Sequence, residues 1–314
     1  MSRILITGVN GFTGRYLAPD LAAQGHEVHG LVYQLPGADE PLTEGVNHLH
    51  ACNLLDAAPL SRLIHELKPD KVAHLAAIAF VGHGDVDAIY RTNILGTRNL
   101  LQALASSNVP PTAVLLASSA NVYGNATAGV IDESTTPAPA NDYAVSKLAM
   151  EYMAATWRSQ LPITVVRPFN YTGVGQTENF LLPKIVAHFA KRAPVLELGN
   201  LDVERDFSDV RTLVQCYSRL LSTPSAGQVL NVCSGHGQSL KSILAMAAEI
   251  TGYMPEIRVN PAFVRANEVH KLVGSCARLE RVIGPVNAIP IKKTLAWMIE
   301  AAMPPSAHGA GSLK

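Results

Sequence analysis

The chain has 314 residues, of which 48% are hydrophobic, and its 25 lysine and arginine residues balance 25 aspartate and glutamate residues. This length can bury a sizeable core, and the zero net charge argues against nucleic acid or a membrane surface as a partner. No apolar run approaches the roughly 18 residues of a membrane span, and four cysteines without close pairing indicate reduced thiols in a cytoplasmic protein.

The first half of the chain alternates short apolar runs with longer helical patterns. Strands are expected at residues 4–7, 28–33, 48–52, 71–75, 113–117 and 163–167. Helices are expected between them, at 14–24, 57–67, 87–105 and 142–159. This regular alternation, with strands that are apolar on both sides, predicts a doubly wound parallel sheet of the Rossmann type, covered by helices on both faces.

The alternation is lost after residue 167. A stretch rich in proline and glycine leads to a helix at 184–191, strands at 195–198 and 228–233, and a helix at 240–251. We expect residues 1–167, together with 205–234, to form the Rossmann domain. Residues 168–204 and 235–303 are expected to form a smaller α/β substrate-binding lobe, and residues 304–314 a disordered tail.

A glycine-rich turn, Gly8-Val9-Asn10-Gly11-Phe12-Thr13-Gly14, follows the first expected strand and opens the first expected helix. Glycines here let the backbone approach a pyrophosphate, and a helix N-terminus offers unpaired N–H donors and a favourable dipole. Turns of every kind collect glycine, so the triplet alone is a weak signal. Its position between the first strand and the first helix favours a dinucleotide site.

Two further motifs carry groups suited to proton transfer. Tyr143 and Lys147 share a face of the expected helix at 142–159, so the ammonium is expected to lower the pKa of the phenol. Ser119 follows the expected strand at 113–117, at the end of the sheet where open α/β folds bind ligands. A surface Tyr–Lys pair or a serine-rich turn would explain either motif alone. Their occurrence together with the glycine turn favours a catalytic site.

These motifs resemble those of the extended short-chain dehydrogenase/reductase superfamily, in its nucleotide-sugar branch. The resemblance also rests on Arg167-Pro168-Phe169-Asn170, His74-Leu75-Ala76-Ala77 and Asn93-Ile94-Leu95-Gly96-Thr97, and it covers residues 4–299. It implies that Ser119, Tyr143 and Lys147 are catalytic. In this reading Tyr143 exchanges the proton, Lys147 binds the nicotinamide ribose and tunes Tyr143, and Ser119 polarises the sugar carbonyl.

The resemblance implies a nicotinamide cofactor, NADP(H) or NAD(H). NAD-specific members usually have an acidic residue at the end of the second strand and NADP-specific members often have arginine, whereas this chain has Tyr33-Gln34. Arg15 could approach a 2′-phosphate, which favours NADPH or dual use. The implied cofactor-binding residues are Gly8, Asn10, Gly11, Phe12, Thr13, Gly14, Tyr33, Asn53, Leu54, Leu75, Ala76, Ala77, Asn93, Ser118, Tyr143, Lys147 and Pro168.

The substrate implied by the resemblance is a GDP-sugar. The segment at 198–207 resembles the part of GDP-mannose dehydratases and their partner reductases that holds GDP, and Arg265-Ala266-Asn267-Glu268 resembles their downstream Arg-x-x-Glu. Arg205 and Arg265 could each fork onto diphosphate or guanine acceptors, and Glu268 could accept from ribose hydroxyls or guanine N–H groups. The implied substrate-binding residues are Phe80, Ser119, Asn121, Asn170, Asn179, Lys184, Leu198, Asn200, Arg205, Arg265 and Glu268.

The residue two positions after the catalytic serine separates the possible reactions. The 4,6-dehydratases of the superfamily have an acidic residue there, whereas this chain has Asn121, and a neutral amide cannot transfer a proton. We therefore expect NAD(P)H-dependent reduction of the 4-keto group of a GDP-4-keto-6-deoxyhexose, with GDP-D-rhamnose as the product. The alternative is a 4-epimerase of a GDP- or UDP-hexose. A GDP-mannose 4,6-dehydratase or a nucleotide-sugar-binding protein without turnover fits the residues less well.

Two features concern a metal and a partner. His48, His50 and Cys52 alternate along one expected strand and share a face, as metal ligands can, but no fourth ligand has fitting spacing. No metal is therefore expected. The resemblance implies a homodimer built on the helices at 87–105 and 142–159.

Overall fold

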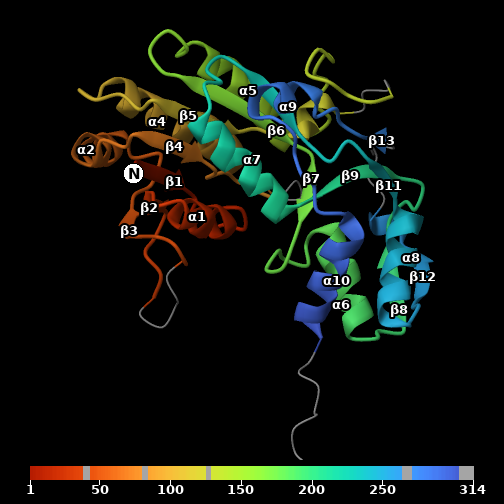
Figure 1. The fold of residues 1–314 in the computed structure, drawn as a ribbon. Helices are drawn as coiled ribbons and strands as arrows, with labels where there is room; N and C mark the ends of the chain where they lie inside the picture. Colours follow the sequence, from red (N-terminus) through yellow and green to blue (C-terminus); the bar gives the residue numbers. More distant parts are fainter. Residues whose placement is uncertain (38–42, 80–83, 125–128, 264–270, 304–314) are drawn as a thin grey trace, which may run out of the picture.

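A seven-stranded parallel sheet forms the centre of the fold, in the order β10-β6-β5-β4-β1-β2-β3 (Figure 1). The computed structural model describes residues 1–37, 43–79, 84–124, 129–263 and 271–303, so the expected tail at 304–314 lies outside the described residues. The strands are β1 (Arg3–Thr7), β2 (Glu27–Val32), β3 (His48–Ala51), β4 (Lys71–His74), β5 (Ala113–Ala117), β6 (Ile163–Pro168) and β10 (Val229–Val232). Every neighbouring pair is parallel.

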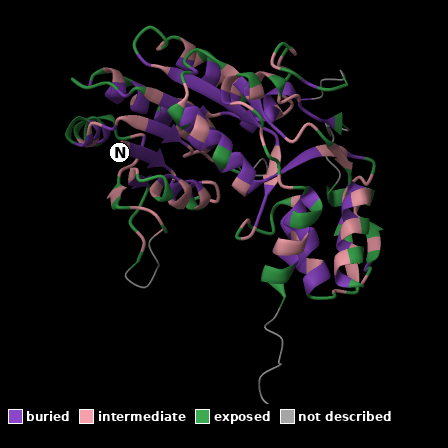
Figure 2. Ribbon diagram, viewed as in Figure 1, coloured by how far each residue is buried: buried purple, intermediate pink, exposed green. Residues whose placement is uncertain are grey.

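The inner strands are buried on both faces, because successive side chains point to opposite sides of the sheet. Ile4 and Ile6 belong to one hydrophobic cluster with α1 (Gly14–Ala23), α7 (Val210–Ser222) and α9 (Ala277–Ile283). Leu5, between them, belongs to a second cluster with α2 (Ala57–Leu67), α4 (Thr97–Ala105) and α5 (Asp142–Ala155). Figure 2 shows these strands as the buried centre of the molecule. The expected doubly wound sheet is confirmed.

The expected helix at 87–105 is one helical run with a change of pitch inside it. It consists of α3 (Val86–Tyr90), a π-helical turn (Arg91–Gly96) and α4. The wider turn buries Asn93 and Gly96 against the neighbouring elements. Local π-turns of this kind are frequent at functional sites, and this one places Asn93 beside α5, which carries Tyr143 and Lys147.

The second half of the chain forms a smaller lobe with its own core (Figure 1). β7 (Asn170–Thr172), β11 (Gly237–Ser239) and β13 (Lys271–Leu272) all join β9 (Glu204–Asp209) in one sheet, and β8 (Val195–Leu198) pairs with β12 (Glu256–Val259). Three helices cover them: α6 (Leu181–Ala190), α8 (Leu240–Thr251) and α10 (Ile291–Ala302). Two short 3₁₀ turns, Ala120–Tyr123 and Pro261–Phe263, complete the described elements.

The chain crosses between the two parts several times. β9 belongs to the sheet of the lobe, whereas α7, which follows it directly, packs on the main sheet. β10 then returns to the main sheet beside β6. None of the helices in the described ranges has the length and hydropathy needed to cross a membrane.

Candidate active site

The three glycines of the turn after β1 have different surroundings. Gly8 has a positive φ of 70°, and a Cβ there would lie 2.8 Å from the Cα of Ala76. A Cβ at Gly14 would lie 2.4 Å from the carbonyl oxygen of Val9, which is rigid backbone. Gly11, in contrast, is exposed, and its Cβ would meet only the carbonyl of Gly8. Gly8 and Gly14 thus serve the tight turn and the helix packing, and Gly11 leaves backbone open to a pyrophosphate, as a dinucleotide turn requires.

The implied cofactor-binding residues gather at the carboxyl ends of the main-sheet strands. β1 leads into the glycine turn, β2 into Tyr33, β3 into Asn53 and Leu54, β4 into Leu75-Ala76-Ala77 and β5 into Ser118, and Pro168 ends β6. These strand ends meet at one edge because the sheet is parallel, and that edge is the usual ligand-binding edge of open α/β sheets. Tyr33 is strongly exposed there. The residues present therefore fit a dinucleotide cofactor.

Two side chains of the turn contact the lobe. The ring of Phe12 stacks on that of Tyr171 in β7, with 5.9 Å between centroids, and the hydroxyl of Thr13 lies 2.8 Å from the Tyr171 hydroxyl. Thr13 does not cap α1 with its side chain. Asn10 is exposed, and its carbonyl accepts from Nε of Arg15 at 2.9 Å. The contacts of Phe12 and Thr13 with Tyr171 thus hold the glycine turn against the lobe.

A buried histidine lies beneath this edge. The hydroxyl of Thr97 donates to the carbonyl of Asn93, so Nε2 of His74, 2.8 Å away, must donate to Thr97. Nδ1 of His74 then accepts from the hydroxyl of Thr7 at 2.7 Å, and Thr7 in turn accepts from the N–H of Ala76. Burial, with a smaller contribution from the charge of Lys147, lowers the pKa of His74 to about 3, so the ring is neutral.

Asn93 continues this chain of hydrogen bonds to the catalytic helix. Its amide bonds both the N–H and the carbonyl of Ile78, and its Nδ2 also donates to the hydroxyl of Ser146 at 3.0 Å. Ser146 donates to the carbonyl of Tyr143. Asn93 was expected to bind the cofactor, but here its side chain is buried and saturated by protein groups, which suits a positioning role.

The candidate catalytic residues lie together at the ends of β5 and α5. Tyr143 and Lys147 are one helical turn apart and are 7% and 5% exposed. Nζ of Lys147 donates to the carbonyl of Ala117, the last residue of β5, at 2.7 Å. Ser119, two residues further on, shares a hydrogen bond with Tyr143. Tyr143, Lys147 and Ser119 are therefore held together by the packing of α5 on β5.

The titration behaviour of Tyr143 differs from the expectation. Burial raises the pKa of its phenol above the ordinary value, and the hydrogen bond with Ser119 offsets this only in part. Lys147 was expected to lower the pKa of Tyr143, but its ammonium is bonded to Ala117 and contributes no resolved effect there. Burial also lowers the pKa of Lys147 to about 8, with Glu151 opposing. At neutral pH Tyr143 is thus a protonated phenol beside a mostly charged lysine.

The hydrogen-bond partners of the Ser119 hydroxyl determine whether it donates or accepts. Its oxygen accepts from both the backbone N–H and the side-chain Nδ2 of Asn121, each at 3.1 Å. With two donors on its oxygen, the serine hydroxyl acts as a donor itself, and its hydrogen bond with Tyr143 points its proton towards the phenol oxygen. Ser119 is therefore oriented to donate to an oxygen atom next to Tyr143.

A buried ion pair fixes the helix that carries these residues. Glu151, one turn beyond Lys147, accepts from Nε and Nη2 of Arg167 in β6 at 2.9 and 2.6 Å. It also accepts from the hydroxyl of Ser118 at 2.5 Å. Nη1 of Arg167 donates to the hydroxyl of Tyr123. Sequence reasoning quoted Arg167 as a motif residue but missed Glu151, although its spacing of four from Lys147 places it on the same helix face.

The implied substrate-binding residues are more dispersed. Lys184 in α6 lies over the ring of Phe263, with Nζ 4.0 Å from its centroid, and a Cβ on Gly199 would lie 2.6 Å from the Phe263 carbonyl. Lys184 and the 199–200 turn therefore meet at Phe263. Asn170 is the first residue of β7, and Asn179 is exposed. Arg205 lies in β9 and donates to the carbonyl of Glu204. Asn200 accepts from the N–H of Asp202.

Leu198 lies apart from this surface. It is 2% exposed and packs in the core of the lobe, so its side chain supports the following turn instead of facing a ligand. Phe80, Arg265 and Glu268 lie outside the described residues. Sequence reasoning also missed Asp206, which is fully buried and accepts from the N–H groups of Ser234 and Gly235, tying β9 to the turn after β10.

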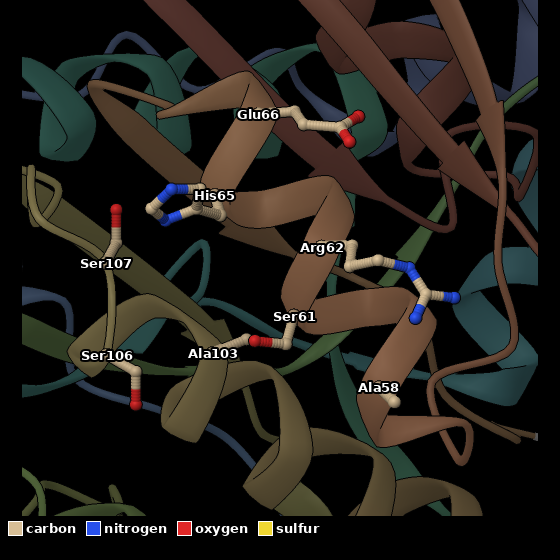
Figure 3. Close-up of a pocket in the computed structure, with 8 residues that line it drawn as sticks. All are labelled: Ala58, Ser61, Arg62, His65, Glu66, Ala103, Ser106 and Ser107. Atoms are coloured by element: carbon tan, nitrogen blue, oxygen red, sulfur yellow. The ribbon is translucent and has the colours of Figure 1, made fainter.

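The described residues also form a cavity that is separate from this edge. It has a volume of about 400 Å³ and lies between α2 and α4 (Figure 3). Its lining residues are Ala58, Ser61, Arg62, His65, Glu66, Ala103, Ser106 and Ser107. None of these is an expected site residue, and the helix ends that form it lead into the amino-terminal ends of β4 and β5. The candidate catalytic groups lie at the opposite edge of the sheet.

Comparison with known proteins defines the family. The profile of the GDP-mannose 4,6-dehydratase family matches residues 5–298. GDP-6-deoxy-D-mannose reductase from Pseudomonas aeruginosa is 37% identical in an alignment 304 residues long that covers 93% of this chain and 94% of the relative. GDP-6-deoxy-D-talose 4-dehydrogenase from Aggregatibacter actinomycetemcomitans is 35% identical over 282 residues, 90% of this chain and 91% of the relative.

Two solved structures share the fold. A protein from Burkholderia cenocepacia J2315 that carries a provisional epimerase name is 50% identical, with a TM-score of 0.90 over 96% of this chain and 98% of the other. RMD from Pseudomonas aeruginosa, solved with NADPH, is 35% identical, with a TM-score of 0.82 over 96% of this chain and 97% of the other. The fold and site thus define an NAD(P)-dependent oxidoreductase of the short-chain dehydrogenase/reductase type. The chain belongs to the GDP-mannose 4,6-dehydratase family.

The different surroundings of Gly14 and Gly11 lead to a testable prediction. Gly14→Ala forces a methyl group against the Val9 carbonyl, so we expect the free energy of unfolding in urea to fall by about 1–3 kcal/mol. Gly11→Ala should cost less stability but weaken NADPH binding measured by calorimetry, because its methyl faces the open side of the turn. Gly37→Ala, with open space around it, is the control. Equal effects of Gly14→Ala and Gly37→Ala would contradict the packing argument.

Proposed function

We propose that this protein reduces the 4-keto group of a GDP-4-keto-6-deoxyhexose with NADPH or NADH and releases GDP-D-rhamnose. The observation that carries the proposal is the pairing of two donors. The phenol of Tyr143 is held protonated by burial, and the hydroxyl of Ser119 acts as a donor beside it because Asn121 donates to its oxygen. Reduction of a ketone consumes one proton and builds negative charge on oxygen, so both donors match its needs.

The proposed reaction divides the work among the three residues. Ser119 donates a hydrogen bond to the C4 oxygen and stabilises the charge that develops on it. The bound nicotinamide supplies the hydride that forms the new C4–H bond. Tyr143 then transfers its proton to that oxygen, which completes the alcohol. Lys147, whose ammonium donates to the carbonyl of Ala117, would bind the nicotinamide ribose beside Tyr143.

Asn121 favours reduction over dehydration. A 4,6-dehydratase must remove a proton from C5 and help the C6 hydroxyl to leave, which needs an acid–base group near Ser119. In this chain the residue at that place is an amide that donates to Ser119. The runner-up is a 4-epimerase of a GDP- or UDP-hexose, which uses the same Ser119, Tyr143 and Lys147. It is supported by the provisional epimerase name of the Burkholderia cenocepacia protein.

We further propose that the carboxyl edge of the main sheet binds the cofactor and that the lobe binds the GDP portion. Gly11 would face the pyrophosphate, and Arg15 would lie close to the adenosine ribose. The end of β2 has Tyr33-Gln34 and no acidic side chain that would repel a 2′-phosphate. This absence of an acid favours NADPH. Arg205, Arg265 and Glu268 would hold GDP. A cytoplasmic location is in keeping with four free cysteines.

The assay that tests this function supplies purified protein with GDP-4-keto-6-deoxymannose and either NADPH or NADH. We expect absorbance at 340 nm to fall, faster with NADPH, and NMR to identify GDP-D-rhamnose. GDP-6-deoxy-D-talose, the C4 epimer, would place this protein with the Aggregatibacter actinomycetemcomitans relative instead. No oxidation of either cofactor with a competent substrate, or interconversion of GDP-hexoses without net oxidation, would refute the reductase assignment.

Removing one hydroxyl tests the role of Tyr143. Tyr143→Phe should lower kcat by about 10²–10⁴-fold, the usual contribution of a general acid, while calorimetry shows NADPH binding close to that of the unmodified protein. Tyr152→Phe makes the same change at an exposed position of α5 and serves as the control. Turnover retained by Tyr143→Phe would remove this residue from its proposed role.

We propose that two copies associate through α5 and the helical run of α3 and α4. Val145 and Tyr152 are seven residues apart on α5, so they share a stripe, and both are exposed apolar side chains. Leu95, in the adjoining π-helical turn, is also exposed. Sedimentation should give twice the chain mass of 33.5 kDa. Tyr152→Glu should shift the protein to monomers, whereas Met254→Glu, at an exposed apolar residue of the lobe, should not. A monomer before any substitution would refute the dimer.

A further inference from the structure

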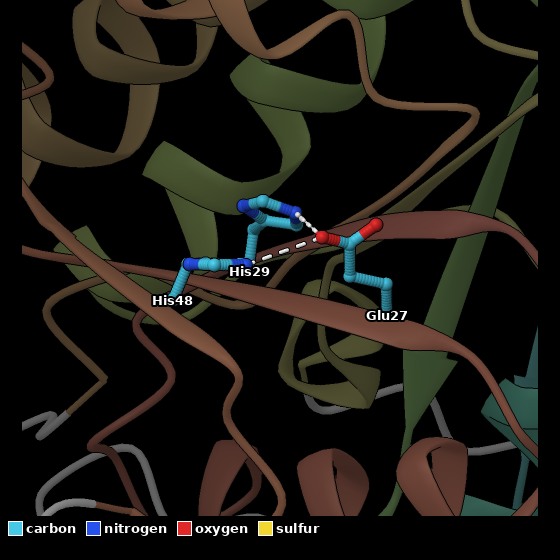
Figure 4. A group of neighbouring side chains, drawn as sticks. All are labelled: Glu27, His29 and His48. Carbon is cyan, nitrogen blue, oxygen red and sulfur yellow. Dashed lines mark ion pairs between the residues drawn. The ribbon is translucent and has the colours of Figure 1, made fainter.

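Three side chains converge at the amino-terminal ends of β2 and β3, at the opposite edge of the sheet from the glycine turn (Figure 4). Glu27 and His29 are two residues apart in β2 and so share a face, and His48 opens β3 directly beside His29 in the register. The ligand atoms of the three side chains all lie within 4.8 Å of one another. The sequence placed His48, His50 and Cys52 on one face and led us to expect no metal, but Cys52 lies beyond the end of β3 and the carboxylate of this cluster comes from β2.

The spacing of these atoms is that of metal ligands. Nε2 of His29 and Nε2 of His48 lie 3.3 and 3.2 Å from the same oxygen of Glu27. Zinc–ligand bonds of about 2.0–2.1 Å in a tetrahedron place ligand atoms about 3.3 Å apart. Carboxylate oxygen and imidazole nitrogen are both ligands that divalent transition metals accept.

The Nε2 atom of His29 is buried without a hydrogen-bond partner in the described part of the chain. Its residue is 7% exposed, and within the described residues its Nε2 is buried with no partner in hydrogen-bond geometry, despite its proximity to Glu27. Its other ring nitrogen, Nδ1, lies 3.1 Å from Nε2 of His50. Nε2 of His29 faces a carboxylate oxygen of Glu27, so a proton or a metal cation between these two atoms satisfies both.

His50 lies where it can orient the ring of His29 through a hydrogen bond. Metal-ligating histidines usually donate their second ring N–H to a neighbouring acceptor, which fixes the tautomer and the orientation of the ring. The rings of His29 and His50 stack with 5.4 Å between centroids and 10° between planes, and His48 stacks on His29 from another side. The side chain of His48 is 55% exposed and leaves an entry path from solvent.

We propose that Glu27, His29 and His48 bind one divalent transition-metal ion of the Zn²⁺ type, with water completing the coordination and His50 orienting His29. The site ties the edge strand β3 to β2, at the end of the sheet away from the catalytic groups. It is independent of the proposed reductase function, and its success or failure does not depend on the sugar substrate.

Titration of the metal-stripped full-length protein with Zn²⁺, followed by calorimetry, tests the site. We expect one equivalent to bind, and Co²⁺ titrated in its place to give the visible absorption of a low-symmetry site with nitrogen and oxygen ligands. Glu27→Gln keeps the size of the side chain and His48→Ala alters an exposed position, so both should fold and both should lose saturable binding. His50→Phe keeps the ring stack without the acceptor, and should weaken binding about 10–100-fold at the same stoichiometry.

Two variants control for other metal-binding groups on the chain. His65→Ala removes an exposed histidine of α2, and Cys276→Ser removes a thiol that is hydrogen-bonded to Cys233. Both should bind one equivalent as the unmodified protein does. The absence of saturable Zn²⁺ binding, or binding that survives in both Glu27→Gln and His48→Ala, overturns the proposal. Circular dichroism of each variant separates loss of the site from loss of the fold.

Discussion

The bidentate ion pair between Glu151 and Arg167 is the interaction on which the geometry of the site depends. Both side chains are less than 10% exposed, and removing one partner of such a buried pair usually costs about 3–5 kcal/mol, because it leaves an uncompensated charge. The pair joins α5 to β6, and the bond from Ser118 adds the end of β5. Tyr143 and Lys147 lie on the same face of α5 as Glu151. The Glu151–Arg167 ion pair therefore fixes how far Tyr143 and Lys147 lie from the ends of the strands.

A second constraint connects the cofactor edge to the catalytic helix. Hydrogen bonds run in one direction from the N–H of Ala76 through Thr7, His74, Thr97 and Asn93 to the helix backbone at Tyr143. Every hydroxyl and ring nitrogen along this path has a single assignment because His74 is neutral. The strand that leads into the glycine turn and the helix that carries the proton donor thus form one rigid unit. The relative positions of a hydride donor and a proton donor must be set with a precision of a fraction of an ångström, and a rigid unit can provide that precision.

The family performs several reactions on one scaffold, and its relatives carry reductase, dehydrogenase and dehydratase names. The Ser–Tyr–Lys group suits all of them, since each begins or ends with transfer at a sugar carbon. What separates them in this chain is the side chain that touches Ser119. Asn121 donates to the oxygen of Ser119 and brings no second acid, which is the basis of the proposed reduction.

The sequence by itself predicted the doubly wound sheet, the glycine turn and the shared helix face of Tyr143 and Lys147, because apolar strands, turn glycines and helix spacing are local properties. The grouping of these two residues with Ser119 came from the family resemblance. It could not determine that β9 lies in the sheet of the lobe while α7, which follows it, lies on the main sheet, since strand pairing joins distant residues. Only the tertiary structure placed Glu151 against Arg167 and His48 against Glu27 and His29. It also decided the direction in which the pKa of Tyr143 shifts, because burial by the surrounding elements raises it and the hydrogen bond with Ser119 offsets this only in part. Spacing supplies the neighbours along one helix, whereas solvation and contacts across the fold determine their charge state.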